Sequence, residues 1–434
     1  MTVFVRTIFL IFAIVLVMTA VGRGRQLRNN FSLEFSERFR FLAWDNAVSL
    51  ASADEAGRTF TRHRTSLGGR WRPLPEIELH LKLTNEFRYY FVPENPDIDF
   101  DEIFFDQLYV KTENPFRWPL SLTVGRQNIM LGEMFMVMDG HPLDGSRSIY
   151  FNAVRLDWTV NSRHKITALG LYQTETDRYL PVINDRDQAL VEQPEAGYGL
   201  YYTGHWRGTG IDIYGLVKKV KSNAAYPTKS TINTVGGRLD CPVRVHLDYV
   251  IEAAYQFGRR NDSRRAAFGG YSYFRLRPAG PADPAWLPKT IRTGGLYLSG
   301  DDPDTENWED WDPMFARWPK WSESYIYTQI KEDRVAYWTN LASLFVSLGF
   351  SPDDRIDFRL DYHHLMAPRH PPRDDPFPGG DGKTRGDLIM GKLIFAINDH
   401  WSGHILWEGF IPGDYYTDLS DGYNWLRTEL MFRF

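Results

Sequence analysis

The last eleven residues of the chain, Asn424–Phe434, alternate between apolar and polar side chains with a period of two. The mostly apolar face carries Asn424, Leu426, Thr428, Leu430, Phe432 and Phe434. The mostly polar face carries Trp425, Arg427, Glu429, Met431 and Arg433. Successive side chains of a strand point to opposite faces, and a tilted strand of about 9–11 residues can cross a bilayer in a β-barrel. The stretch therefore predicts a transmembrane strand, with the terminal edge strand of a soluble sheet as the alternative.

The beginning of the chain favours the membrane interpretation, because it has the features of a secretory signal peptide. Arg6 provides a basic n-region, Ile8–Met18 an apolar h-region and Ala20–Gly22 a small-residue cleavage site. The apolar run is too short for a comfortable transmembrane helix, which needs about 20 apolar residues. We therefore expect residues 1–22 to be cleaved on export and residues 23–434 to form one outer-membrane β-barrel domain.

Composition excludes several classes of protein. The single cysteine, Cys241, rules out an intramolecular disulfide, and a formal net charge of -5 argues against a nucleic-acid partner. A mean hydropathy of -0.40 is compatible with a membrane barrel, since only alternate residues of each strand must be apolar. Arginine outnumbers lysine roughly three to one. Arginine stays charged and can bind carboxylates through two hydrogen bonds, so this balance suits a wall that meets anions.

Alternating segments recur along the whole mature chain and predict about eighteen strands. They are Phe31–Leu42, Arg58–Trp71, Glu76–Tyr90, Glu102–Glu113, Leu120–Met130, Ser148–Val160, His164–Thr174, Ala196–Arg207, Gly210–Val220, Thr231–Asp240, Val245–Gly258, Arg265–Arg277, Pro288–Gly300, Tyr337–Gly349, Arg355–Met366, Gly386–Ile397, Trp401–Ile411 and Asn424–Phe434. An even number of strands is typical of bacterial single-chain barrels and would place both termini in the periplasm. The C-terminal Phe434, preceded by alternating apolar residues, also predicts recognition by the outer-membrane assembly machinery.

The connections between these segments sort onto two rims. Short turns such as Asn161–Arg163, Arg207–Thr209, Asp240–Arg244, Ser351–Asp354 and Asn398–His400 fall on one rim. Long segments fall on the other, namely Asn46–Gly57, Leu131–Arg147, Asp177–Glu195, Asp301–Ala336 and Ala367–Arg385. Short periplasmic turns and long outer loops are the asymmetry that outer-membrane barrels show. A propeller is disfavoured, because no repeat of blade length recurs.

The basic residues within the strands provide the candidate binding site. An arginine or lysine facing lipid near mid-membrane costs about 2–4 kcal/mol, so basic residues in the polar phase must face the lumen. The candidates are Arg38, Arg40, Arg62, Arg64, Lys82, Arg88, Arg155, Arg359 and Arg427. Acids in the same phase are Glu34, Glu78, Asp157, Asp248, Glu252, Asp357, Asp361, Glu408 and Glu429. Two interpretations remain open: a neutralised ladder that only stabilises the wall, and a constriction where arginines meet anionic sugars.

No pattern of enzyme or metal chemistry is present. The chain lacks the serine-hydrolase, zinc-protease and phosphate-loop motifs, so neither catalysis nor a cofactor is predicted. His363 and His364 are neighbours on a strand and point to opposite faces, so they cannot bind one metal together. The acidic, tryptophan-rich stretch Asp301–Trp321 could bind sugar or calcium, or serve as a solvated outer loop. Sequence alone leaves open whether this loop folds into the lumen.

Several stretches resemble the alginate-export family of outer-membrane barrels. The most specific are LSLTVGRQNIMLGE (Leu120–Glu133) and MDGHPLDGSRSIYFNAVRLDW (Met138–Trp158). Weaker matches are HLDYVIEAAYQFG (His246–Gly258), LYLSGDD (Leu296–Asp302) and WEGFIPGDYY (Trp407–Tyr416). The alginate exporter that gives the family its name has a long periplasmic turn before its penultimate strand, whereas the corresponding segment here, Asn398–His400, is short.

The resemblance implies a monomeric, eighteen-stranded barrel in the outer membrane of a Gram-negative bacterium. It implies an arginine-rich lumen that passes anionic oligo- or polysaccharide or small organic anions by diffusion, with Arg126, Arg147 and Arg155 as the family-type basic positions. Two other functions stay open: a surface adhesin or scaffold with a plugged pore, and a secreted, soluble β-protein that binds or cleaves sugars.

Overall fold

The computed structural model describes residues 30–47, 50–54, 57–94, 102–138, 150–278, 280, 283–316, 321–322, 339–370 and 380–434. The predicted signal peptide and Arg147 lie outside these described residues. Within the described ranges, no helix is long and apolar enough to span a membrane.

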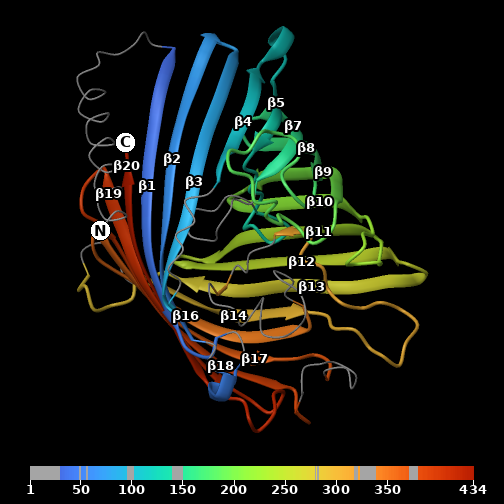
Figure 1. Cartoon of the computed structure of the whole chain (residues 1–434), viewed down its shortest axis with the longest axis vertical. Helices are drawn as coiled ribbons and strands as arrows, with labels where there is room; N and C mark the ends of the chain where they lie inside the picture. Colours follow the sequence, from blue (N-terminus) through green and yellow to red (C-terminus); the bar gives the residue numbers. More distant parts are fainter. Residues whose placement is uncertain are drawn as a thin grey trace.

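Eighteen antiparallel strands form a single sheet, and β1 pairs with both β2 and β20, so the sheet closes into a barrel (Figure 1). The wall strands are β1 (Phe31–Trp44), β2 (Arg58–Leu74), β3 (Ile77–Val92), β4 (Ile103–Glu113), β5 (Leu120–Gln127), β7 (Phe151–Asn161), β8 (His164–Gln173), β9 (Glu195–Trp206), β10 (Thr209–Val220), β11 (Ser230–Arg244), β12 (Leu247–Arg260), β13 (Ser263–Leu276), β14 (Thr290–Leu298), β16 (Leu341–Asp353), β17 (Ile356–Met366), β18 (Thr384–Ala396), β19 (Trp401–Pro412) and β20 (Tyr423–Arg433). Two short strands, β6 (Val137–Met138) and β15 (Phe315–Ala316), form a separate parallel pair. Short 3-10 helices lie at Ser52–Asp54 (η1) and Pro115–Arg117 (η2).

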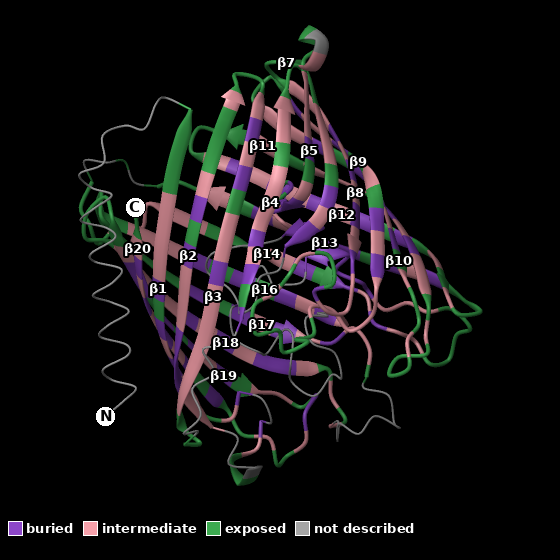
Figure 2. Ribbon diagram, turned by 45° about the horizontal axis from the view of Figure 1, so that its top comes forward, coloured by how far each residue is buried: buried purple, intermediate pink, exposed green. Residues whose placement is uncertain are grey.

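Burial alternates along the wall strands as the period-two pattern predicts (Figure 2). On β12, Glu252 and Gln256 are buried and point inward, whereas Tyr255 and Phe257 are exposed on the outside. Glu37 is an exception, because it lies on the outward face of β1. Its carboxylate accepts a hydrogen bond of 2.5 Å from Thr65, its cross-strand partner on β2, and this bond lowers the cost of placing a carboxyl group on the outer face.

The eighteen predicted strands are confirmed, but two predicted turns are wrong. Of the turn predicted at Ser351–Asp354, the first three residues belong to β16, which ends at Asp353. We predicted a turn at Asp240–Arg244, but these residues continue β11, and the turn falls at Val245–His246. A register shift between Pro242 and Arg244 lets β11 accommodate a proline, which is tolerated in sheets at such irregularities. The sorting of connections onto two rims has exceptions: residues 277–289 form a long connection on the short-turn rim, and 261–262 a short one on the long-loop rim.

Two connections fold into the barrel and fill part of the lumen. They are residues 128–138, after β5, and residues 301–316, after β14, and β6 and β15 join them. Phe135 of the first stacks on Trp311 of the second with ring centroids 5.4 Å apart, and both rings are buried. Residues 311–316 of the stretch Asp301–Ala336 are buried inside the barrel, a question that the sequence had left open.

The barrel wall is shaped to receive this inward segment. A Cβ atom at Gly269 on β13 would lie 2.6 Å from the Trp311 ring, and one at Gly197 on β9 would lie 2.2 Å from the Phe315 ring. These distances are far below van der Waals contact, so both aromatic rings pack directly against backbone. The absence of wall side chains at these two positions sets how deeply the segment sits.

Polar contacts hold the inward segment on the β10–β12 side of the wall. The Lys218 ammonium group donates to the Asp312 carboxylate at 3.1 Å and to the Met314 carbonyl oxygen at 3.0 Å. The Gln256 side chain both donates to the Asp312 carbonyl oxygen at 2.6 Å and accepts from its backbone N–H at 3.0 Å. Further along the chain, the Ser322 hydroxyl donates to Glu408 on β19 at 2.8 Å. Asp312 thus contacts the wall at β10–β12, and Ser322 contacts the wall at β19.

Candidate functional site

Five of the predicted lumen arginines meet in two adjacent cross-strand rows on β1, β2 and β3. The upper row pairs Arg40 with Arg62 and Arg62 with Arg88. The lower row pairs Arg38 with Arg64 and Arg64 with Glu86. We call these six positions the arginine array: Arg38, Arg40, Arg62, Arg64, Arg88 and Glu86. The array arises because arginine recurs at every second position of β1 and β2, which keeps the side chains on the lumen face.

Glu86 is shared between two arginines of the array. Its carboxylate accepts a hydrogen bond from Arg62 Nε at 2.8 Å and one from Arg38 Nη2 at 3.4 Å. Arg40 instead pairs with Glu429 on β20, whose Oε2 lies 2.5 Å from Arg40 Nε. Arg62 is 6% exposed, and its Nη2 has no hydrogen-bond acceptor among the residues that the structure describes. The array therefore concentrates positive charge in a poorly solvated part of the wall.

A β-bulge brings a further carboxylate below the array. The register between β3 and β4 shifts between Lys82 and Leu83, and Asp106 on β4 turns into the lumen. Its carboxylate contacts Lys82 Nζ at 2.9 Å and Arg64 Nη2 at 3.3 Å. Bulges commonly redirect one side chain in this way. Lys82, a predicted site residue, thus adjoins the array through the carboxylate that it shares with Arg64.

The array has distinct borders along the strands. The next row towards the outer rim is apolar and aromatic, with Leu42 opposite Phe60 and Phe60 opposite Tyr90. Arg88 lies over the Phe60 ring, 5.6 Å from its centroid, and donates a hydrogen bond to the Tyr90 hydroxyl at 3.3 Å. The row towards the periplasm is uncharged and consists of Ser36, Ser66 and Thr84. The charged band is therefore two rows high on these strands.

The three remaining predicted site residues lie apart from the array. Arg427 on β20 is nearest, and its Nε lies 2.9 Å from His404 Nε2 in the lumen. Arg155 on β7 pairs with Asp157 on the same strand at 2.9 Å, with β4 and β5 between it and β3. Arg359 on β17 pairs with Asp361 at 2.6 Å, and its side chain is 47% exposed. Arg155 and Arg359 face the lumen as predicted, but each has its own carboxylate.

A second set of lumen charges lies on β10–β13, and of its members the sequence prediction named only Asp248. In this set, which we call the Arg/Asp ladder, Arg238 contacts Asp212 at 2.7 Å and Arg275 contacts Asp240 at 2.8 Å and Asp248 at 2.9 Å. Arg277 also contacts Asp248. All the members that lie on strands occupy lumen-facing positions of the period-two alternation. Applying that alternation to every strand would have found them. Lys218 and Lys392, both buried, were missed for the same reason.

Another family-type position serves a structural contact. Arg126 on β5 forms two hydrogen bonds with Asp177, at 2.8 and 2.7 Å, and its guanidinium lies 3.8 Å from the centre of the Tyr150 ring. The Tyr150 hydroxyl donates to the same carboxylate at 2.7 Å. This buried group ties the connection after β8 to the wall. In the part of the chain that the structure describes, no three acidic, histidine or cysteine side chains gather to hold a metal.

A sequence model of the family described as "Alginate export" matches residues 20–367 of the chain. The chain belongs to the alginate export family. No protein with a curated description matches the sequence. The soluble alternative is thereby excluded, because the family and the closed barrel together identify an outer-membrane protein of the Gram-negative type.

Solved structures similar to this member of the alginate export family are outer-membrane porins. OccK2 (OpdF) of Pseudomonas aeruginosa in complex with glucuronate has a TM-score of 0.57 at 12% identity, over 93% of this chain and 97% of that one. OpdK of Pseudomonas aeruginosa with vanillate has a TM-score of 0.56 at 9% identity, over 93% and 98%. OccAB3 of Acinetobacter baumannii has a TM-score of 0.56 at 9% identity, over 93% and 99%. At these identities the likeness shows the fold alone. Together with the family it identifies an outer-membrane channel.

Proposed function

We propose that this channel passes small organic anions, of the size of a sugar acid, by diffusion past the arginine array. The observation that carries the proposal is the array itself, in which five arginines occupy two adjacent rows of three strands. Like charges directly opposite each other on a sheet are destabilising. Among the described residues, three carboxylates (Glu86, Glu429 and Asp106) contact the array and Lys82, which together carry six cations. A carboxylate entering the lumen would gain charge-assisted hydrogen bonds there.

The inward segments favour a small solute over a polymer. Residues 128–138 and 301–316 occupy lumen space, and Ser322 contacts the wall at Glu408. The turn between β18 and β19 covers only residues 397–400, so the long periplasmic turn of the alginate exporter has no counterpart here. Two structural neighbours were solved with glucuronate and with vanillate, both small carboxylates. These facts support a sugar acid or aromatic acid as substrate, with alginate-like oligomers as the wider class.

The lumen sites carry different roles in this proposal. Arg40, Arg62 and Arg88 would bind the carboxylate, while Arg38, Arg64 and Lys82 would hold the field positive around Glu86 and Asp106. Arg427 would extend the positive wall onto β20. Arg155 and Arg359, each beside its own aspartate, would contribute little to binding.

Conductance of the purified protein in a planar bilayer tests the proposal. Glucuronate, glucose and glucosamine share a ring size and differ in charge, so we expect glucuronate alone to interrupt the current and to permeate preferentially. A charged hydrogen bond contributes about 1.5–3 kcal/mol. The triple variant Arg40→Gln/Arg62→Gln/Arg88→Gln should therefore bind glucuronate more weakly. The glucuronate concentration that blocks half of the current should rise about tenfold or more.

Arg155→Gln is the matched control, because it removes a lumen arginine outside the array and should change glucuronate block less than twofold. Equal responses to the three sugars would refute the anion preference. A barrel that folds but never conducts would instead favour a surface scaffold, for which the inward segments are the supporting observation.

A further inference from the structure

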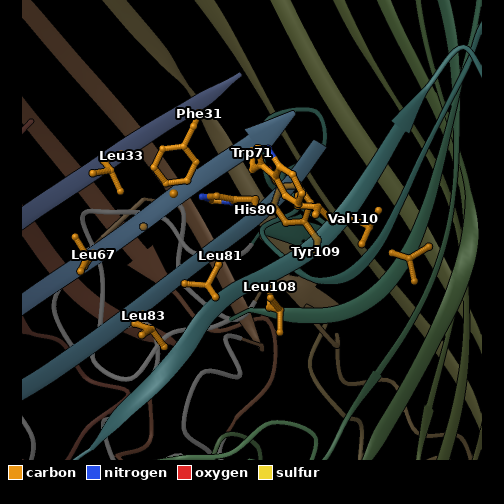
Figure 3. A pocket seen from close by; sticks show the side chains of 14 residues that line it. Phe31, Leu33, Leu67, Trp71, His80, Leu81, Leu83, Leu108, Tyr109 and Val110 are labelled. Atoms are coloured by element: carbon orange, nitrogen blue, oxygen red, sulfur yellow. The ribbon is translucent and has the colours of Figure 1, made fainter. Parts of the chain in front are cut away.

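The outer surface of the barrel has a groove that plays no part in the lumen. It crosses β1–β5 and has a volume of about 550 Å³ (Figure 3). Its walls are apolar and include Phe31, Leu33, Leu67, Trp71, Leu81 and Val110. These side chains project from the outward face of their strands, as their exposures of 39–53% indicate. The groove thus opens onto the band of the wall that faces the bilayer.

A missing side chain creates the groove. Gly69 lies on the outward face of β2, opposite Leu33 on β1 and Leu81 on β3. The nearest atoms to a Cβ atom at Gly69 would be Phe31 Cζ, at 3.4 Å, Phe31 Cε2, at 3.5 Å, and the Ser32 carbonyl oxygen, at 3.5 Å, all at ordinary contact distance. A larger side chain therefore has room at this position. The polar residues of the lining are engaged: His80 hydrogen-bonds to Glu34, and the Tyr109 hydroxyl donates to Glu78 at 3.2 Å.

The place of the groove in the wall identifies its occupant. Because Trp71 lies four residues before the β2–β3 turn and Phe31 begins β1, the groove occupies the periplasmic half of the wall. Strands β2 and β3, which run beneath the groove, are paired on both sides, so a protein strand cannot add to the sheet there. On β1, only residues before Phe35 lack a partner on the β20 side. We propose that the groove binds one acyl chain of a phospholipid of the periplasmic leaflet.

The groove is continuous with the band of the wall that faces the bilayer. A soluble partner would not reach it there, because lipid covers this band. A chain lying in it is held on both sides, by Phe31 and Leu33 on one strand and by Leu81 and Val110 on others. The expected result is a phospholipid that exchanges more slowly here than around the rest of the barrel.

Photo-crosslinking of the full-length protein in vesicles tests this site. The probe is phosphatidylethanolamine with a diazirine on one acyl chain, and labelled peptides are located by mass spectrometry. We expect labelling of residues 67–71 and 79–83 to exceed that of other outward segments about fivefold. Gly69→Leu should reduce this labelling to the level of the other strands, because leucine fills the groove and remains favourable on a lipid-facing surface.

Gly215→Leu on β10 is the matched control, because Gly215 is exposed and a Cβ there has no neighbour within 4 Å. It should leave labelling at 67–71 unchanged. Heat-modifiable gel mobility reports the folding of both variants, and glucuronate conductance should be unchanged in both, which separates this site from the channel function. Even labelling around the wall, or unchanged labelling in folded Gly69→Leu, would overturn the proposal.

Discussion

The lumen has two charged walls that use arginine in opposite ways. In the Arg/Asp ladder on β10–β13, Arg238 and Arg275 each contact two or more carboxylates, and the signs alternate towards the periplasm. In the arginine array on β1–β3, the cross-strand neighbour of Arg62 is an arginine on both sides. The ladder is an arrangement that stabilises the wall by itself. The array is an arrangement that a bound anion would stabilise further.

This difference shows why the number of lumen arginines is a poor guide to selectivity. Arg155 and Arg359 face the lumen like the members of the array, yet each lies within 3 Å of an aspartate on its own strand. The field that a solute meets depends on which cations are neighbours. Strand register decides that, because a shift of one residue would turn the arginines of β2 to the lipid face.

The largest effect should come from removing the carboxylate inside the array. Glu86→Gln leaves Arg38 and Arg62 without their shared carboxylate, and breaking a buried ion pair costs about 3–5 kcal/mol. We expect a loss of about 3 kcal/mol in the free energy of unfolding, measured in vesicles by denaturant and tryptophan fluorescence. Glucuronate at saturating concentration should restore part of it. A variant as stable as the native chain would remove the contrast between the two walls.

Removing a single arginine should change the free energy of unfolding by a smaller amount, and the change should differ in sign between the two walls. Arg275→Met deprives Asp240 of its closest cation and should lower the free energy of unfolding by about 1–2 kcal/mol. Arg62→Met relieves repulsion by Arg40 and Arg88 and leaves Glu86 with Arg38, so we expect unchanged or slightly higher stability. The same unfolding measurement compares the two. Equal losses would mean that array arginines stabilise the wall as ladder arginines do.

The smallest effect concerns salt. The Debye length falls from about 10 Å at 0.1 M to about 3 Å at 1 M salt, but the array is largely buried, which limits screening. Raising KCl across this range should weaken glucuronate block about threefold, as measured by single-channel recording. Arg275→Met should show the same salt dependence as the native protein. A shallower dependence in this variant would assign part of the anion affinity to the ladder.

The barrel was largely predictable because a transmembrane strand repeats one rule at every second residue. β1, β3 and β20 were located from this alternation within a few residues, and Phe39 and Arg40 were assigned to the correct faces. Prediction failed where the rule is interrupted. Pro242 was interpreted as part of a turn, although an irregularity lets β11 continue past it.

The lumen-facing phase of the candidate residues was predictable from the sequence, but their grouping was not. Phase alone put Arg38, Arg62 and Arg155 into the lumen, and it could not show that the first two are neighbours while the third is remote. Which strands lie side by side follows from the strand count, but which residues face each other follows from register. Asp106 was not identified because the bulge at Lys82 and Leu83 changes the phase of β4. The fold of residues 301–316 into the lumen depends on contacts between distant segments, such as Lys218 with Asp312.

Gly197 and Gly269 have a consequence for how such channels can be altered. At Gly197 the ring of Phe315, and at Gly269 the ring of Trp311, occupies the space that a wall side chain would fill. The wall and the inward segment are therefore complementary in shape. An inward segment taken from another barrel would arrive with bulky groups at other heights and find no hollow to receive them. Exchanging the segment together with its receiving strands, β9 and β13, is the transplant that would keep the lumen intact. The unit that an engineer can swap in this barrel is therefore a loop with its facing wall.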